Sequence, residues 1–188
     1  MKLIKTMASS LIAIGLFINQ AMAEDYIIDV KGAHASVQFK ASHLGYSYVV
    51  GRFNTFEGTF SYDESDPSAS SVNVTIDATS LDTNHAERDK HLRSSDFLET
   101  DTHPIISFVS TSVTPGDEDN IAITGDLSIH GITKSVVLDA VHIGNGKDPW
   151  GGYRRGFEGT TTLAVENFGL PAWVGEIEIT VIAEGIQQ

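Results

Sequence analysis

The feature that most constrains this chain is the alternation of apolar and polar residues in many short segments. In residues 121–129, Ile121, Ile123, Leu127 and Ile129 share one phase with Gly125, and mostly polar residues take the other. A period of two places every second side chain on the same face of a β-strand. Eight segments follow this pattern, and they span residues 36–41, 52–62, 72–78, 106–110, 121–129, 136–140, 157–165 and 177–183.

The connections between these segments are mostly short, which predicts an antiparallel meander in the form of a barrel or a sandwich. The pair His130-Gly131 is typical of a tight hairpin, because glycine readily adopts the positive φ that such a turn requires. Regular hairpins favour the barrel, since closure removes exposed sheet edges. We therefore predict an all-β fold with an eight-stranded antiparallel barrel, whose interior holds packed side chains or one small ligand.

One segment departs from the strand pattern and follows the third predicted strand. Residues 84–93 are rich in charged residues and helix formers, with Leu92 as their clear apolar residue and Phe97 and Leu98 just beyond. Asn84 and Glu87 have the spacing of a capping pair at a helix start. We predict a short helix that is too polar for the core and lies on or across an opening of the barrel.

The N-terminus has the pattern of an export signal. Lys2 and Lys5 precede an apolar stretch at 11–18, and Ala21-Met22-Ala23 provides the small residues that signal peptidase requires. The apolar stretch is shorter than the roughly 20 residues of a membrane-spanning helix. We predict that residues 1–23 are a cleaved signal peptide and that residues 24–188 form one domain in the bacterial periplasm, although charge does not distinguish periplasm from full secretion.

Composition argues against several classes of partner. Loss of Lys2 and Lys5 with the signal peptide changes the formal net charge from −13 to −15. A surface with this negative charge repels nucleic-acid phosphates and anionic lipid headgroups. We therefore expect neither nucleic-acid binding nor stable membrane insertion. The chain has no cysteine, and its core must be stable without disulfides.

The charged helix contains the candidates for catalysis or metal binding, but they lack supporting residues. His85 with Asp89, and Glu87 with His91, are four residues apart, yet the two pairs point to different helix faces. A triad of Ser94 or Ser95, His91 and Asp96 has no GxSxG motif to support it. We expect no catalytic residue, no metal site and no cofactor.

The inward-facing phase of the predicted strands defines a candidate interior. By the residues alone, this interior is either a filled core or a ligand channel, and the small residues Gly125, Gly159 and Thr161 in the same phase leave some room. The predicted lining residues are Phe39, Phe56, Phe60, Ile76, Phe108, Ile123, Leu127, Leu138, Phe157 and Ile179.

Four segments together resemble the YceI-like family of small secreted bacterial proteins. They are HLGYS at 43–47, DTNHAERDKHLRSSDFL at 82–98, ITGDLSIHGITKSV at 123–136 and DPWGGYRRGFE at 148–158. The resemblance covers the mature chain and implies a lipocalin-like barrel in the periplasm. It also implies a long apolar channel, lined by the inward phase, that takes up isoprenoid or other amphiphilic lipids.

Polar contacts to a lipid headgroup are not specified by the resemblance. His142 continues the apolar phase of the sixth strand, and either points inward near a mouth or is solvated at a frayed strand end. Arg52 and Arg154 are the cations proposed to meet a phosphate or carbonyl group, with surface ion pairs as the alternative. Loop aromatics form either a gate or a plug at the barrel ends, and they are Tyr46, Tyr48, Trp150 and Trp173.

These observations lead to one predicted function and two alternatives. We predict a periplasmic carrier or sequestering protein, monomeric or homodimeric, that binds a polyprenyl lipid or isoprenoid quinone in the barrel without covalent chemistry. The first alternative is an enzyme for a hydrophobic substrate that uses His85, Arg88 and Asp89. The second is a stress or interaction protein whose barrel is filled by its own side chains.

Overall fold

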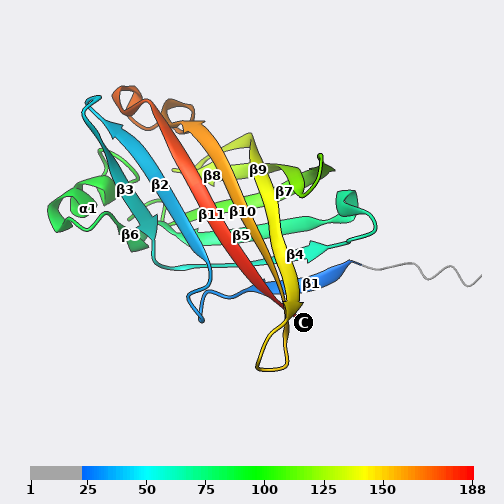
Figure 1. Ribbon diagram of the computed structural model, residues 1–188. Coiled ribbons are helices and arrows are strands. Elements are labelled where there is room, and N and C mark those ends of the chain that lie inside the picture. Colours follow the sequence, from blue (N-terminus) through cyan, green and yellow to red (C-terminus); the bar gives the residue numbers. More distant parts are fainter. Residues whose placement is uncertain (1–22) are drawn as a thin grey trace, which may run out of the picture.

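A computed structural model describes residues 23–188 of the chain, so the predicted signal peptide lies outside the described residues apart from Ala23. The described part contains one α-helix, α1 (Ala86–Arg93), four 3₁₀ turns and a set of antiparallel strands (Figure 1). The strands are β1 (Glu24–Ile28), β2 (Ser36–His43), β3 (Ser47–Phe53), β4 (Phe56–Tyr62), β5 (Ser71–Asp77), β6 (Leu81–Asp82), β7 (Ile105–Pro115), β8 (Asn120–Ile129), β9 (Ile132–Lys147), β10 (Tyr153–Ala164) and β11 (Glu176–Gln187).

Eight strands close into an antiparallel barrel, as predicted. Their order around the wall is β1-β4-β5-β7-β8-β9-β10-β11, and β11 returns to pair with β1 through Ile186 and Ile27. From β7 to β11, each strand pairs with the next one along the chain, which gives the long hairpins visible in Figure 1. The predicted lipocalin-like architecture with one short helix is therefore confirmed.

The wall is widened at one end by three further strands. β11 pairs with β1 only near its C-terminus, and its first half, from Ile177 to Ile182, pairs with β2 instead. β2 forms a hairpin with β3, and β3 pairs with β6 through Phe53 and Leu81. In Figure 1 this extension lies at the end of the barrel that carries α1. The barrel is therefore flared at the α1 end.

The strands of the barrel are not all those expected from the sequence. The segment 52–62 was predicted as one strand, but it contains the end of β3 and all of β4. The break occurs because the amides of Asn54 and Thr55 donate to the backbone oxygen and hydroxyl of Ser80, not to a neighbouring strand. Tyr48, predicted in a loop, lies in β3. The closing strand β1 was not predicted.

The tight turn at His130-Gly131 is confirmed. It joins β8 to β9, and both residues have positive φ, 52° at His130 and 73° at Gly131. Two consecutive positive φ angles are the requirement of the hairpin turn whose twist matches antiparallel strands.

The predicted helix start is displaced by one residue. The N-cap of α1 is His85, whose Nδ1 accepts a hydrogen bond from the amide of Arg88 at 3.2 Å. Asn84 instead has a positive φ of 60°, and its amide donates to Asp82. The capping pair of Asn84 and Glu87 was therefore wrong, because the chain needs Asn84 to turn from β6 into the helix.

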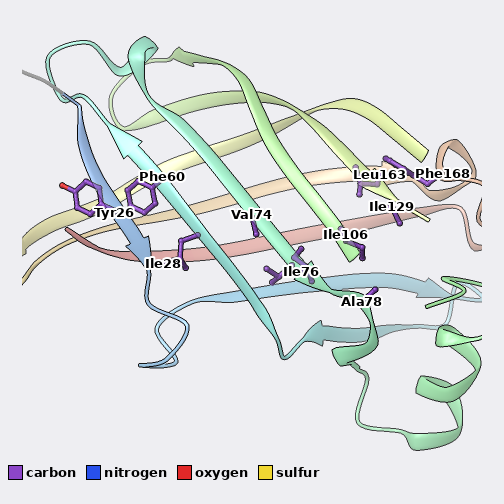
Figure 2. Packing of buried hydrophobic residues seen from close by; sticks show 11 residues of the cluster. Tyr26, Ile28, Phe60, Val74, Ile76, Ala78, Ile106, Ile129, Leu163 and Phe168 are labelled. Atoms are coloured by element: carbon purple, nitrogen blue, oxygen red, sulfur yellow. The ribbon is translucent and has the colours of Figure 1, made fainter. Parts of the chain in front are cut away.

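The buried apolar side chains form a layer along the inside of the wall. Figure 2 shows Tyr26 and Phe60 together at one end of this cluster and Ile129, Leu163 and Phe168 at the other. The rings of Tyr26 and Phe60 are stacked, with centroids 4.7 Å apart. These residues come from distant parts of the sequence, so they hold the closed wall together.

Candidate functional site: the barrel cavity

The barrel encloses an apolar cavity of about 750 Å³. This volume lies within the range of about 300–1,000 Å³ found for small-molecule pockets. The interior is therefore not filled by side chains, and the filled-barrel alternative does not describe this structure. Nine of the ten residues predicted to line the interior do so, and they are Phe39, Phe60, Ile76, Phe108, Ile123, Leu127, Leu138, Phe157 and Ile179.

Phe56 is the exception among the predicted lining residues. It packs against the buried cluster of the wall and is absent from the cavity lining, whereas its cross-strand neighbour Ile76 belongs to that lining. Phe56 is the first residue of β4, where the chain has just turned away from β3. The pattern correctly placed its side chain on the inward face but did not show how far along the barrel the cavity extends.

Glycines explain how a barrel rich in aromatic residues remains hollow. A Cβ atom on Gly125 would collide with the ring of Phe108, and one on Gly159 would lie 2.8 Å from Leu138 Cδ2. Each large side chain therefore lies over a glycine of the neighbouring strand, close to the wall. The small residues make room, as expected, but neighbouring side chains occupy that room and the centre stays open.

The cavity has its mouth at the α1 end. The end of β2 and the turn after it contribute His43 and Leu44. The segment around α1 contributes His91 and Phe97, and the loop before β11 contributes Trp173. The ring of Phe97 packs edge-on against Trp173, with centroids 5.7 Å apart. Leu44 and Trp173 are 76% and 77% exposed, so two large apolar side chains stand in solvent at the entrance.

The charged residues of α1 attach the helix to the wall. Asp89 is buried and accepts hydrogen bonds from the amide of Thr83, at 2.9 Å, and from its hydroxyl. Arg88 donates to the hydroxyl and carbonyl oxygens of Thr83, and Arg93 donates to the carbonyl of Leu81 at 2.9 Å. These three charged side chains therefore anchor the helix to the wall beside the mouth.

A polar cluster lies near the opposite end of the cavity, around Arg155. This guanidinium is 2% exposed and donates to the hydroxyl of Tyr26 at 3.3 Å, to Glu64 at 3.1 Å and to Nε2 of His142 at 3.3 Å. It also lies 4.5 Å from the ring centroid of Tyr62, which lines the cavity. The barrel thus presents one buried positive charge behind an aromatic wall.

His142 belongs to this cluster and points inward. β9 continues beyond it to Lys147, so the predicted fraying of this strand was wrong. Its ring stacks on Tyr62 at 5.9 Å and contacts Phe157 at 5.1 Å. Burial, together with the positive charge of Arg155, lowers the pKa of His142, and this favours the neutral imidazole.

Arg154 faces away from the cavity and joins an ion-pair network at the same end of the barrel. It donates to Asp29 at 2.6 Å, to Asp148 at 2.7 Å and to Glu184. Its guanidinium also lies 5.4 Å from the Trp150 ring, so it fixes the 148–152 loop, as the ion-pair alternative proposed. The hydrogen bond from Arg154, together with one from His34, lowers the pKa of Asp29 to about 2.

Arg52 is exposed on β3, opposite Asp82 of β6, and does not line the cavity. Of the three residues proposed to contact a headgroup, only His142 lies beside the cavity. Sequence reasoning missed Arg155, although a signal was present: Arg155 has the same strand phase as Phe157 and Gly159, so it faces inward.

In the part of the chain that the structure describes, no helix is long and apolar enough to cross a membrane.

Comparison with known proteins identifies the family. Residues 26–185 match the YceI-like domain. The chain belongs to the YceI-like family. A UPF0312 protein of Shewanella sp. is 48% identical over 98% of this chain and 99% of its own length.

Solved structures of YceI-like proteins share the barrel. The Campylobacter jejuni YceI protein is 27% identical, with a TM-score of 0.70 over 78% of this chain and 90% of that one. A polyisoprenoid-binding domain from Saccharophagus degradans is 13% identical, with a TM-score of 0.64 over 87% of this chain and 98% of that one. The second likeness concerns the fold alone.

Proposed function

We propose that this YceI-like protein binds one long apolar molecule of the isoprenoid type inside its barrel and acts as a carrier or sequestering protein. The observation that carries the proposal is the apolar cavity of about 750 Å³, which extends from the exposed mouth to the polar cluster of Arg155. The polyisoprenoid-binding domain of similar fold supports the ligand class.

The volume and apolar lining of the cavity are sufficient for an isoprenoid tail. If each non-hydrogen atom takes roughly the 30 Å³ of a water molecule, the cavity accommodates on the order of 25 atoms, or about five isoprene units. Each buried methylene contributes about 0.8 kcal/mol. Ten of them outweigh the lower estimates of the association cost, about 4 kcal/mol, so a tail binds without any polar contact.

A headgroup would find hydrogen-bond donors near the far end of the cavity. Tyr62 lines the cavity, and its hydroxyl forms no hydrogen bond with other described residues. Behind it, Arg155 supplies a fixed positive charge. A carbonyl or phosphate oxygen is an acceptor that this arrangement would stabilise.

Export to the periplasm is a further part of the proposal and rests on Lys2, Lys5 and the Ala21-Met22-Ala23 pattern. The test is the intact mass of the protein recovered from the periplasmic fraction of its host. We expect a mature chain that begins at Glu24, and an uncleaved N-terminus would contradict export by this signal.

We propose binding without catalysis, because the enzyme alternative relied on residues that have structural contacts here. His85 caps α1, while Arg88 and Asp89 both bind Thr83. Replacing His85 with Ala distinguishes the two functions. A carrier should change at most in stability or in loading, whereas an enzyme should retain its ligand and lose turnover.

The main test is mass spectrometry of an organic extract of the purified protein, followed by uptake of an added polyprenol or quinone. A matched pair of variants locates the ligand, because Thr161 lines the cavity and its neighbour Thr160 faces solvent. Thr161→Trp should reduce the amount of bound lipid severalfold, and Thr160→Trp should leave it unchanged. Absence of lipid in the extract together with no uptake would refute the proposal.

A further inference from the structure

Three metal-ligating side chains converge outside the barrel cavity. Glu99 and His103 lie in the segment between α1 and β7, and His130 lies in the β8–β9 turn. Glu99 Oε2 is 3.6 Å from His130 Nε2 and 3.9 Å from His103 Nε2, and the three ligand atoms lie within 4.8 Å of one another. Two histidines and a carboxylate are therefore brought together by two segments that are distant in sequence.

The hydrogen bonding of His130 shows what this cluster needs. Its Nδ1 lies 3.3 Å from the backbone carbonyl of Phe168, which can only accept a hydrogen bond, so we assign the ring proton to Nδ1. When the ring carries only this proton, Nε2 has a lone pair and faces the carboxylate of Glu99. The 3.6 Å separation is too long for a hydrogen bond. Two acceptors that face one another are stabilised by a cation between them.

The side chains around the cluster support this orientation. The hydroxyl of Thr102 donates to Glu99 Oε1 at 3.1 Å, which leaves Oε2 for the two histidines. A Cβ atom on Gly131 would lie 2.8 Å from His103 Cε1, so glycine in the turn allows His103 to approach His130. Partners that fix the ring tautomer and the carboxylate are typical of metal ligands.

A second cluster of two carboxylates and a histidine provides a comparison. Asp29, His34 and Glu184 also lie within ligand distance of one another, but Arg154 binds both carboxylates and supplies the positive charge. Among the described residues, no lysine or arginine forms an ion pair with Glu99. The first cluster thus lacks the internal cation that the second one has.

We propose that Glu99 Oε2, His103 Nε2 and His130 Nε2 bind a divalent transition-metal ion of the zinc class. With metal–ligand bonds of about 2.0–2.1 Å, tetrahedral ligands lie about 3.3 Å apart. The two Glu99 contacts, at 3.6 Å and 3.9 Å, would therefore shorten by about 0.3–0.6 Å, and the two histidine ligand atoms, which lie within 4.8 Å of one another, by at most about 1.5 Å. Imidazole donors favour zinc, copper or nickel over magnesium or calcium. The side chains are partly exposed, which leaves a fourth position for water.

This site was not expected from the sequence, whose metal-ligand candidates were the pairs on α1. Its position suggests a structural consequence. The metal would join the segment after α1 to the β8–β9 turn, which already contacts the loop of Phe168. Figure 2 shows Ile129 and Phe168 close together at this end of the barrel. Val165 and Leu170, on either side of Phe168, line the cavity. Metal binding would therefore stiffen the mouth end, although the proposal does not depend on lipid binding.

The test uses the untagged protein, stripped of metal with a chelator, and titration calorimetry with Zn²⁺ at neutral pH. We expect one equivalent of Zn²⁺ to bind, with affinity reduced at least tenfold in Glu99→Gln, His103→Gln and His130→Asn. Asn is chosen at position 130 because it tolerates positive φ. The matched controls are His85→Gln and His91→Gln on α1, which should bind as the unsubstituted protein does.

Substitution with Co²⁺ provides an independent readout, because histidine coordination in a four-coordinate site gives visible absorption bands. These bands should appear at one equivalent and be lost in Glu99→Gln, a substitution on a partly exposed side chain that spares the fold even if His130→Asn does not. Zn²⁺ affinity that is equal in the unsubstituted protein and Glu99→Gln overturns the proposal. So does Zn²⁺ binding that the α1 substitutions abolish, or no stoichiometric binding at all.

Discussion

The guanidinium of Arg155 lies 4.5 Å from the ring centroid of Tyr62, and the Tyr62 ring lines the apolar cavity in front of this buried charge. The charge is retained in the barrel because hydrogen bonds to Tyr26, Glu64 and His142 compensate its loss of water. A buried cation beside an apolar cavity is a costly feature, and it gives this end of the cavity a polar neighbourhood.

Replacing Arg155 with Met tests this arrangement. The buried hydroxyl of Tyr26 and the ring of His142 lose a partner, so the free energy of unfolding should fall by about 1–3 kcal/mol. The pKa of His142 should rise, because Arg155 now lowers it, although burial will still hold it below its usual value. Urea denaturation and NMR titration measure the two effects. Arg52→Met, on an exposed strand position, is the control and should change neither quantity.

The network of Arg154 predicts a dependence of stability on pH. The pKa of Asp29 is about 2 in the folded protein against 3.8 ordinarily, so the ionised carboxylate stabilises the fold. This contribution, on the order of 2 kcal/mol, is complete above about pH 4 and is lost as the pH falls towards 2. Asp29→Asn should therefore be less stable than the unsubstituted protein at pH 6, and the difference should shrink between pH 4 and pH 2. A difference that is constant over this range would contradict the assignment.

The fold was predictable because most strands with cavity on one face and solvent on the other alternate apolar and polar residues. The segment 121–129 meets this condition, and it became β8 almost without change. β3 has the same two environments, but its sequence does not alternate, because Val49 lines the cavity and its exposed neighbour Val50 is also apolar. Apolar residues on both faces hide the period of two, and the strand was partly assigned to a loop.

The candidate site was predictable to the extent that it follows from strand phase. Phase places Phe39 and Leu127 on the inner face, but it does not reveal that the side chains rest over glycines and leave the centre empty. It also does not reveal convergence between distant segments. Arg155 and Glu64 are 91 positions apart and meet only through barrel closure. His103 and His130 meet because they flank the paired strands β7 and β8.

The contact between Asp89 and Thr83 predicts how α1 is held beside the mouth. Asp89→Ala leaves the buried amide and hydroxyl of Thr83 without their acceptor, which should destabilise the protein by about 1–3 kcal/mol. Glu87→Ala removes the same charge from an exposed position of the same helix and should have an effect within about 0.5 kcal/mol. Thermal or urea unfolding of the two variants separates anchoring from a general effect of helix charge.

The two tryptophans allow the mouth to be observed directly. Trp173 lines the cavity entrance and packs against Phe97, whereas Trp150 lies in the loop held by Arg154, away from the cavity. Lipid that enters through the mouth should remove water from Trp173 and shift its emission to shorter wavelength. In Trp150→Phe, which retains Trp173, titration with a polyprenol should therefore give the full spectral change. In Trp173→Phe, the emission of Trp150 should stay constant; a change there instead would place the entrance at the opposite end of the barrel.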